Sequence, residues 1–479
     1  MMEVGLAGST LNVGKPRTLH EALGKRRDRV DFLIKETFLA LRGKVLMSPK
    51  LNKIAMKAKS EPKIKFTSLA HLLTPEFLIE TWGDMNRRGA SGIDGETIEE
   101  YGQNLSNNVK GLTDRLKAGR YEAPPVRRVD IPKPGPGNKT RPLGIPTVED
   151  RLLQKAVSII IEAIFEQDFL DVSFGFRPER NPHLALGELR KHITVGKVMQ
   201  IYEADIKGYF NNINHKWLMK MLKHRISDPV ILRLIGKWLK AGVMMNGVVI
   251  RSESGTPQGG PISCILSNIY LHFVLDLWFE KKIKPNLRGK AYIVRFVDDF
   301  VACFQYKADV ISFETDLSSR MEGFGLKLVP EKTRSFNFGR FAKEREAKYG
   351  AKTGTFVFLG FEHICGLDKA NKFSLIRIPS RKSCRKFLNQ VHEWLLKHSH
   401  WKRRDQQRHL SAMLRGFYQY FSLNHCKEKL SWIFREVQLQ WIRSLKRRSQ
   451  RHRMYWSYLL KSEWFKLPFP PSAAIHPRV

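Results

Sequence analysis

Two adjacent carboxylates, Asp298 and Asp299, stand between two apolar runs of the chain. Residues 292–297 alternate in the manner of a strand, and residues 300–304 are again strand-like. The pair is therefore predicted to lie at the turn of a β-hairpin. Holding two repelling anions beside buried strands is costly unless a cation binds there, although Asp is also common in ordinary polar turns.

A third carboxylate, Asp205, is expected at the end of another strand. Residues 198–204 are strand-like, and Lys207-Gly208 would end that strand directly after Asp205. Phosphoryl transfer by two divalent cations needs carboxylates from separate elements that converge on one point. The three aspartates would meet that need, and magnesium, which prefers oxygen ligands, suits such a site. Glu203 lies on the same face of the strand as Asp205, so it remains a rival ligand.

The composition indicates a polyanionic partner. The 479-residue chain carries 83 Lys and Arg against 46 Asp and Glu, a formal net charge of +37. With 42% hydrophobic and 11% aromatic residues it can also build substantial cores. Such an excess of positive charge on a foldable chain favours nucleic acid. We expect no membrane partner, because we find no apolar stretch of roughly 18 or more residues and no signal-peptide pattern.

The five cysteines form no Cys-x-x-Cys pair, which argues against a zinc finger or zinc ribbon. Scattered, unpaired thiols in a chain of this length are typical of a reducing intracellular location.

The texture of the sequence changes along the chain. Residues 1–65 are interpreted as an N-terminal extension that ends in a Lys-rich linker or basic arm. A basic β-hairpin is expected over residues 126–145, followed by a helix from Val148 to Phe165. Residues 166–375 mix short strands and helices, as in an α+β domain. From about residue 380 the pattern is almost wholly helical, with apolar stripes typical of a bundle core.

Several segments resemble the motifs of reverse transcriptases. Phe296-Val297-Asp298-Asp299 resembles their Tyr-x-Asp-Asp box, and Asp205–Phe210 resembles their first metal-binding box. Gly255–Ser263, here called the Pro-Gln-Gly segment, resembles the segment that lies beside the incoming nucleotide. Further family motifs are matched, in chain order, at 91–95, 139–146, 174–178, 325–333 and 358–361. The ordered series spans roughly residues 66–365 and is similar to the reverse transcriptase–maturase proteins encoded by group II introns.

The resemblance implies an α+β fold shaped as a right-hand polymerase. Fingers and palm, with an antiparallel palm sheet and helices, would occupy residues 66–375. An all-α thumb, also called the maturase or X domain, would occupy residues 376–479, and residues 410–421 look like its signature segment. The short remainder after residue 466 leads us to expect no DNA-endonuclease domain.

The chain departs from the family at the aspartate box. Phe296 and Val297 stand where the family usually has Tyr and Ala. Phe296 lacks the hydroxyl, and Val297 adds volume close to the primer end. Both aspartates are intact, so we expect the polymerase chemistry to survive with an altered grip on the primer.

The resemblance also assigns roles to individual residues. Asp205, Asp298 and Asp299 would be catalytic and, with the backbone carbonyl of Ile206, would hold two Mg²⁺ ions, for which Mn²⁺ could substitute. The residues expected to bind the incoming nucleotide are Lys139, Arg141, Phe210, Gln258 and Gly259. Phe210 would be a wall under the sugar that rejects a 2′-hydroxyl, although simple core packing explains it equally well.

A larger basic set is expected to contact nucleic acid. Its members are Arg177, Lys332, Arg404, Arg408, Arg415, Lys446, Arg447, Arg448 and Arg451. For Arg177 an intradomain ion pair with Glu179 is an equal alternative, and Lys332 could be an ordinary surface lysine.

The expected function is RNA-directed DNA polymerisation, combined with binding of the parent group II intron RNA to assist splicing and mobility. The expected partners are that intron RNA, an RNA template with a DNA primer, deoxynucleoside triphosphates and target DNA. The expected location is intracellular, in the bacterial cytoplasm or in an organelle. Two alternatives stay open: an RNA-binding splicing cofactor whose polymerase is dispensable, and a host-domesticated or defence enzyme of the same lineage.

Overall fold

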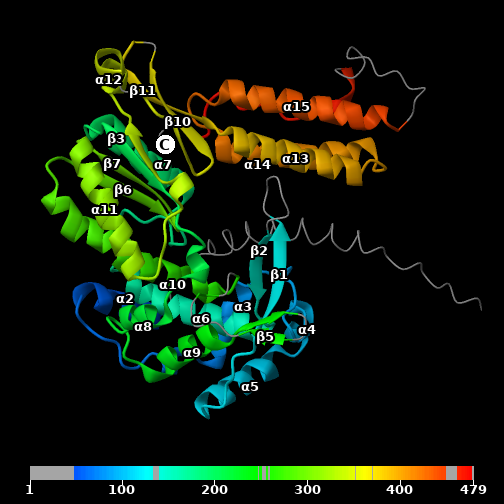
Figure 1. The fold of residues 1–479 in the computed structure, drawn as a ribbon. Helices are drawn as coiled ribbons and strands as arrows, with labels where there is room; N and C mark the ends of the chain where they lie inside the picture. The colour runs from blue at the N-terminus through cyan, green and yellow to red at the C-terminus, as the bar shows by residue number, and fades with distance from the viewer. Residues whose placement is uncertain are drawn as a thin grey trace, which may run out of the picture.

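The computed structural model describes residues 48–132, 140–245, 248–250, 255–256, 259–350, 352–368, 370–448, 461–476 and 479. Most of the predicted N-terminal extension, residues 1–47, lies outside this range. The fold is mixed α+β with largely antiparallel sheets, as expected (Figure 1).

The first described helix corrects the prediction of a linker before residue 66. Helix α2 (Pro49–Ser60) is capped by Ser48 and packs against α6 (Val148–Phe165). Its buried residues Leu51, Ala55 and Ala58 recur at helical spacing and form one apolar face. The prediction was wrong because the segment's low overall apolar content hid this narrow face.

The predicted basic hairpin and the helix after it are confirmed. Strands β1 (Val126–Pro132) and β2 (Thr140–Ile145) pair antiparallel, and α6 covers the predicted residues. Two short strands, β4 (Val243–Met245) and β5 (Val248–Ile250), extend this sheet to the order β2-β1-β4-β5. The other α-helices that the structure describes between residues 48 and 245 are α3 (Pro75–Gly83), α4 (Ile98–Gln103), α5 (Leu105–Lys117), α7 (Pro182–Val195), α8 (His215–Leu222) and α9 (Pro229–Lys240).

A second sheet, which is antiparallel throughout and is here called the central sheet, has the order β6-β7-β3-β8 and lies between the helical layer that contains α2 and α6 and the C-terminal part of the chain (Figure 1). Its strands are β3 (Gln200–Ala204), β6 (Ala291–Phe296), β7 (Asp299–Phe304) and β8 (Arg334–Asn337). Both faces are buried, because alternate residues of β7 enter two different cores. Phe300, Ala302 and Phe304 join the core shared with α6, α10 (Pro261–Leu271) and α11 (Lys307–Gly323). Val301 and Cys303 join the core shared with α7 and the C-terminal helices.

The helix that begins as α10 continues through two π-helical segments, His272–Asp276 and Phe279–Ile283. The whole helix, Pro261–Asn286, is long and apolar enough to cross a membrane by length and composition alone. However, 78% of its most apolar window is buried inside the molecule. It therefore serves as a core helix under the central sheet.

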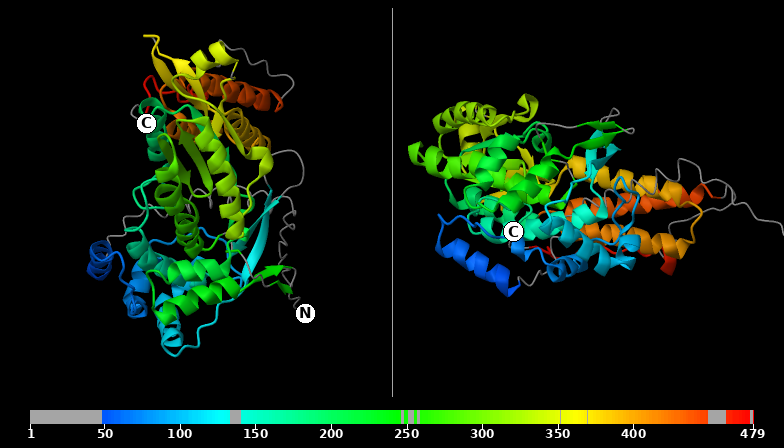
Figure 2. Two further views of the ribbon diagram at one scale, coloured as in Figure 1. Left: turned by 60° about the vertical axis from the view of Figure 1, so that its left-hand side comes forward. Right: turned by 90° about the horizontal axis from the view of Figure 1, so that it is seen from below.

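The C-terminal part joins a small sheet to a helical bundle. The sheet has the order β11-β10-β9, with β9 (Phe356–Phe358), β10 (Phe361–Leu367) and β11 (Phe373–Pro379). Helix α12 (Ala342–Tyr349) precedes it, and α13 (Arg381–Lys397), α14 (Arg403–Phe421) and α15 (Lys427–Lys446) follow. These last three helices lie side by side and project from the rest of the molecule (Figure 2). The predicted helical texture is confirmed from Arg381 to Lys446, whereas residues 466–476 form no helix.

Candidate active site

The aspartate pair lies at the predicted hairpin turn. Phe296 of β6 pairs with Asp299 of β7, so Val297 and Asp298 form a two-residue turn. Val297 has a φ of 62°, which is rare for a β-branched residue. Such a backbone costs about 1–3 kcal/mol and persists only where the surrounding structure enforces it. The turn is therefore held in place by contacts from outside the hairpin.

Strand β3 delivers Asp205 to the same end of the central sheet. Ala204 pairs with Phe300, so the register continued by one residue places Asp205 opposite Asp299. An isolated antiparallel bridge joins Ile206 to Leu328. Its hydrogen bonds use the carbonyl groups of Asp205 and Lys327, and the carbonyl of Ile206 stays outside that pairing. The three aspartates thus come from two strand ends, with a backbone carbonyl next to them.

The electrostatics of this cluster favour a cation. Desolvation by the surrounding protein and repulsion from Asp298, Asp205 and Glu203 raise the pKa of Asp299 to about 7. Asp299 also keeps solvent access at the turn, so a cation can reach its carboxylate.

The donor chemistry of the site suits magnesium, which takes a few carboxylates and completes its shell with water and phosphate oxygens. Among the described residues, no three His, Cys, Asp or Glu side chains are already arranged to hold a metal ion. At this site the ammonium group of Lys332 forms an ion pair with Asp205. Metal binding would therefore require that ammonium group to move away.

The rival ligand Glu203 is engaged elsewhere. Its carboxylate accepts a hydrogen bond from Nε of Arg334 at 2.5 Å, between neighbouring strands β3 and β8. Burial raises the pKa of Glu203 despite this partner. Position favours Asp205 as the ligand from β3, because the register places it opposite Asp299, whereas Glu203 pairs with Val301 further along the strand.

The start of the Pro-Gln-Gly segment is tied to the chain that follows Asp205. The amide of Gly255 donates to Ile213, and that of Thr256 donates to the carbonyl of Phe210, both at 2.8 Å. Gly259 has a φ of 126°, and a Cβ there would approach the carbonyl oxygen of Gly144 to 2.4 Å. The segment thus contacts β2 at a point where only glycine fits.

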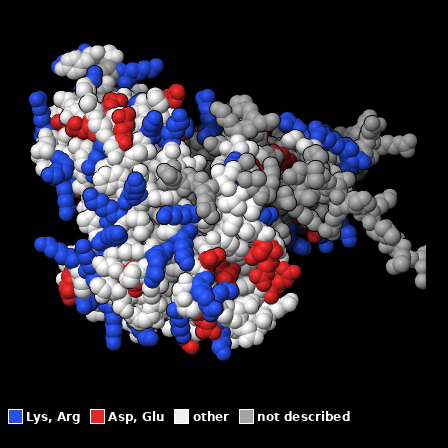
Figure 3. Space-filling view, turned by 60° about the horizontal axis from the view of Figure 1, so that its bottom comes forward, with Lys and Arg blue, Asp and Glu red and all other residues white. Residues whose placement is uncertain are grey.

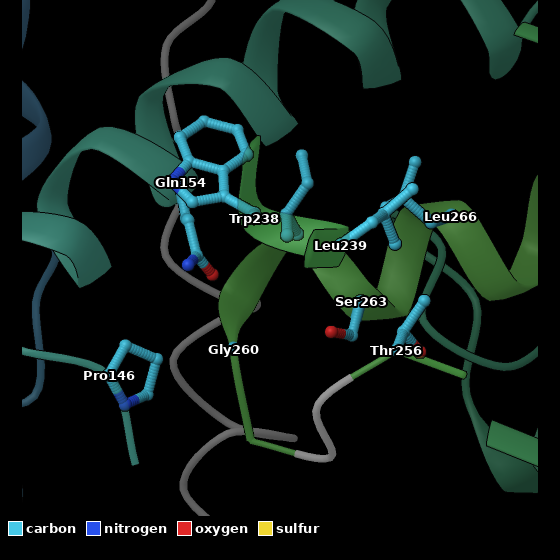
Figure 4. Close-up of a pocket in the computed structure, with 9 residues that line it drawn as sticks. Pro146, Gln154, Trp238, Leu239, Thr256, Gly260, Ser263 and Leu266 are labelled. Carbon is cyan, nitrogen blue, oxygen red and sulfur yellow. The ribbon is translucent and has the colours of Figure 1, made fainter. Parts of the chain in front are cut away.

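A small pocket lies behind this segment (Figure 4). It is lined by Pro146, Gln154, Trp238, Leu239, Thr256, Gly260, Ile262, Ser263 and Leu266. Beside it, Tyr121 and Trp238 donate hydrogen bonds to the buried carboxylate of Asp150. Burial raises the pKa of Asp150 to about 6. This buried support was not anticipated from the sequence, because an acidic residue such as Asp150 is common in the first turn of a helix.

Phe210 is half-buried and packs against both hydrophobic cores. Its ring lies 5.3 Å from that of Tyr209, in a T-shaped arrangement. The carbonyl of Phe210 accepts a hydrogen bond from the amide of Thr256, so the backbone of Phe210 is fixed beside the Pro-Gln-Gly segment.

One predicted nucleic-acid contact is wrong. The side chain of Arg177 is only 3% exposed and pairs with Glu166 at 2.7 Å. It also donates to the carbonyls of Leu170 and Ser173. A guanidinium with all of these partners inside the protein has no donors left for a phosphate. The partner is Glu166, and the alternative pairing with Glu179 is not formed.

Several other predicted residues cannot be placed. Lys139, Gln258 and Arg451 lie outside the described residues, as does the side chain of Arg141. The backbone of Arg141 pairs with Ile131 in the β1–β2 hairpin. Gly259 is exposed, on the segment that reaches β2.

The predicted basic residues of the helical bundle are exposed. Those that the structure describes are Arg404, Arg408, Arg415, Lys446, Arg447 and Arg448. The three on α14 recur at helical spacing and share one face. Arg448, just after α15, donates a hydrogen bond to the carbonyl of Trp401, just before α14. The basic residues at the end of α15 therefore lie beside the start of α14, at one end of the bundle. Elsewhere, Lys and Arg spread over much of one face of the molecule, whereas Asp and Glu gather in smaller areas (Figure 3).

Helix α14 also reaches the aspartate cluster. The hydroxyl of Tyr420 donates to the carbonyl of Leu359 at 2.9 Å. Burial and the charge of Asp299 raise the pKa of Tyr420. The bundle and the aspartate turn are therefore neighbours in this fold.

Comparison with known proteins agrees with this geometry. Residues 131–363 match the family model described as reverse transcriptase (RNA-dependent DNA polymerase). The chain is 33% identical over 324 residues to protein YkfC of Escherichia coli K12, covering 60% of this chain and 84% of YkfC. It is 40% identical over 252 residues to the group II intron-encoded protein LtrA of Lactococcus lactis subsp. cremoris. It is 28% identical over 95 residues to nuclear intron maturase 1, mitochondrial, of Arabidopsis thaliana.

The coverage of these relatives differs. The match covers 50% of this chain and 41% of LtrA, so the chain spans less than half of that relative's length. For the Arabidopsis maturase the shares are 20% and 13%.

The aspartate turn and the matched domain together define a reverse transcriptase, an RNA-directed DNA polymerase. Enzymes of this class generally use divalent metal ions, and their partners include RNA. Within the class, the chain belongs to the group II intron reverse transcriptase/maturase family. The family predicted from the motifs is confirmed.

Proposed function

We propose that this protein copies RNA into DNA at the site formed by Asp205, Asp298 and Asp299. The observation that carries the proposal is the meeting of two strand ends that bring three carboxylates together. Burial and repulsion from the neighbouring carboxylates raise the pKa of Asp299 to about 7. Bringing carboxylates together is unfavourable without a counter-charge, so this site is suited to bind cations and, through them, a triphosphate.

Two magnesium ions are the proposed cofactor, and Mn²⁺ is expected to substitute. The three aspartates and the carbonyl of Ile206 would hold them. When bound, the ions would activate the primer 3′-hydroxyl and neutralise the triphosphate and the leaving pyrophosphate. Lys332, which now pairs with Asp205, would then be released toward a nearby phosphate group.

The proposed division of labour follows the right-hand plan. The β1–β2 hairpin and the helices near it would be the fingers, the central sheet the palm, and α13–α15 the thumb or maturase domain. This plan moves the N-terminal limit of the polymerase body from residue 66 to α2, because α2 packs against α6.

The incoming deoxynucleoside triphosphate is proposed to bind between β2 and the Pro-Gln-Gly segment. The close approach of Gly259 to Gly144 supports this placement, since it brings both segments to one point. Lys139, Arg141 and Gln258 would contribute side chains there, and Phe210 would lie under the sugar.

The proposed RNA partner is the parent group II intron. The exposed basic residues at one end of the α14–α15 bundle support a phosphate-binding surface. We expect this binding to assist splicing and mobility, with target DNA as a further partner. The alternative of a splicing cofactor with a dispensable polymerase makes a different prediction: the intact aspartates would then be unnecessary.

The test is primer extension on an RNA template, with RNA affinity measured in parallel. Asp298→Ala should abolish extension while RNA affinity stays near that of the wild-type protein. A wild-type protein that does not extend primers, yet promotes intron splicing, would favour the cofactor alternative. Continued extension by Asp298→Ala would overturn the site assignment.

A further inference from the structure

A fully buried arginine lies in the strand that leads to the aspartate turn. Arg295 and Asp276 are both 0% exposed, and they form a two-pronged ion pair at 2.8 and 2.5 Å. The third guanidinium nitrogen, Nη1, donates to the carbonyl of Val297 at 2.8 Å and to the side chain of Asn268 at 3.2 Å. Val297 is the residue with the left-handed backbone, directly before Asp298.

The same network fastens a second segment onto the turn. The side-chain amide of Asn268 donates to the carbonyl of Gly175 at 2.7 Å. A Cβ at Gly175 would lie 2.5 Å from the backbone nitrogen of Val297, so this segment presses directly on the turn. The backbone of Arg295 also pairs with this segment, through the carbonyl of Val172 and the amide of Phe174.

The π-helical segment His272–Asp276 explains how one helix supplies both partners of Arg295. Asn268 and Asp276 are eight residues apart, which in a regular α-helix would rotate them about 80° away from each other. A π-bulge absorbs one extra residue in a turn, so these eight residues span about two turns. Both side chains therefore reach the guanidinium from the helix that begins at the Pro-Gln-Gly segment.

We propose that Arg295, held by Asp276 and Asn268, is a positioning residue that enforces the left-handed Val297 and so directs Asp298 and Asp299 toward the metal site. A buried ion pair adds little net stability, because desolvation of both charges offsets their attraction. Its effect here is geometric: a planar fork with five donors can hold a carboxylate and a backbone carbonyl at once. The proposal rests on the proposed polymerase function, and it adds the device that orients the aspartates.

The test compares Arg295→Lys with Arg225→Lys. Lysine keeps the charge beside Asp276 but cannot also reach Val297 and Asn268. Arg225 is a matched control, because its side chain is 4% exposed, pairs with Asp168 at 2.9 Å and donates to the carbonyls of Ala58 and Pro62. Both variants should lose thermal stability to a similar extent.

Only Arg295→Lys should lose function. Its kcat for deoxynucleotide incorporation should fall about 10–100-fold, the usual effect of removing a residue that orients metal ligands. Its affinity for Mn²⁺, followed by the electron paramagnetic resonance of the free ion, should weaken to a similar degree. Affinity for RNA should stay unchanged in both variants.

Three results would overturn the proposal. Arg295→Lys could keep kcat and Mn²⁺ affinity within about twofold of wild type, or Arg225→Lys could lose both equally. If Arg295→Lys does not fold, Asn268→Ala is the deciding variant, because it removes the Asn268 acceptor of Arg295 and leaves the ion pair with Asp276 in place. An unchanged kcat in Asn268→Ala would also overturn the proposal. Failure of the wild-type protein to extend primers would instead refute the proposed function.

Discussion

The buried carboxyl of Asp150 makes the protein less stable as the pH rises. Asp150 lies at the start of α6, where it accepts hydrogen bonds from Tyr121 and Trp238 behind the Pro-Gln-Gly segment. Burial raises its pKa to about 6, against ~3.9 in an unfolded chain. Between these two values the folded state holds the proton more tightly than the unfolded state.

The magnitude follows from that difference. A folded pKa above the unfolded value stabilises the protein fully below about pH 4, and this contribution is lost as the pH rises through about 6. A difference of about two pH units corresponds to ~3 kcal/mol of unfolding free energy. The loss should be complete near pH 7. Asp150→Asn cannot ionise, yet its side-chain oxygen can still accept from Tyr121 and Trp238.

The assay is urea unfolding of wild type and Asp150→Asn between pH 4 and pH 7.5. The free energy of unfolding of the wild type, minus that of the variant, should fall by ~3 kcal/mol over this range. Tyr121→Phe removes a hydrogen bond that lowers the pKa of Asp150, so the fall should move to higher pH in that background. Parallel stability curves for wild type and Asp150→Asn would refute the reasoning.

Two further predictions concern the proposed substrates. Phe210→Ala should weaken discrimination against ribonucleotides by roughly tenfold or more in kcat/KM, measured by incorporation of matched ribo- and deoxynucleotides; unchanged discrimination would assign Phe210 to core packing. Replacing Arg404, Arg408 and Arg415 together with Ala should lower the magnitude of the slope of log affinity against log salt concentration by about 2 to 3 for intron RNA. Each phosphate contact that is lost removes the counterion release that this contact contributed to binding. An unchanged slope would show that this face of α14 does not bind RNA.

Local patterns explain which parts of the fold could be predicted. The hairpin around Asp298 alternates with period two, and the helix Val148–Phe165 is apolar along most of its length, so both were visible in the sequence. The three aspartates could also be predicted, because Asp205 directly follows a strand and Asp298 and Asp299 lie between two strands. Family motifs then supplied the order and the chemistry.

Long-range partners explain what could not be predicted. Arg177 reads as an exposed basic residue until the fold brings Glu166 and several carbonyls around it. The left-handed Val297 runs against the preference of a β-branched residue, and its carbonyl accepts a hydrogen bond from Arg295, which belongs to a buried network of residues from distant segments. One signal was present: a charged residue in the middle of an apolar strand requires a buried partner.

The docking of α2 was missed for a related reason. Its three buried residues are too few to stand out from the lysines around them. The helix is also held by Arg225, far along the chain, which donates a hydrogen bond to the carbonyl of Ala58. A contact of this kind depends on the folded arrangement of two distant segments, which no local pattern contains.

The central claim is that Asp205, and not its neighbour Glu203, completes the catalytic carboxylates. The most direct measurement is single-nucleotide incorporation on an RNA template with Mg²⁺, comparing wild type, Asp205→Asn and Glu203→Gln. The two residues share one strand face, but the register places Asp205 opposite Asp299, whereas Glu203 pairs with Val301. Asp205→Asn should abolish incorporation, whereas Glu203→Gln should stay close to wild type. Incorporation that survives Asp205→Asn, or that is abolished by Glu203→Gln alone, would contradict this claim.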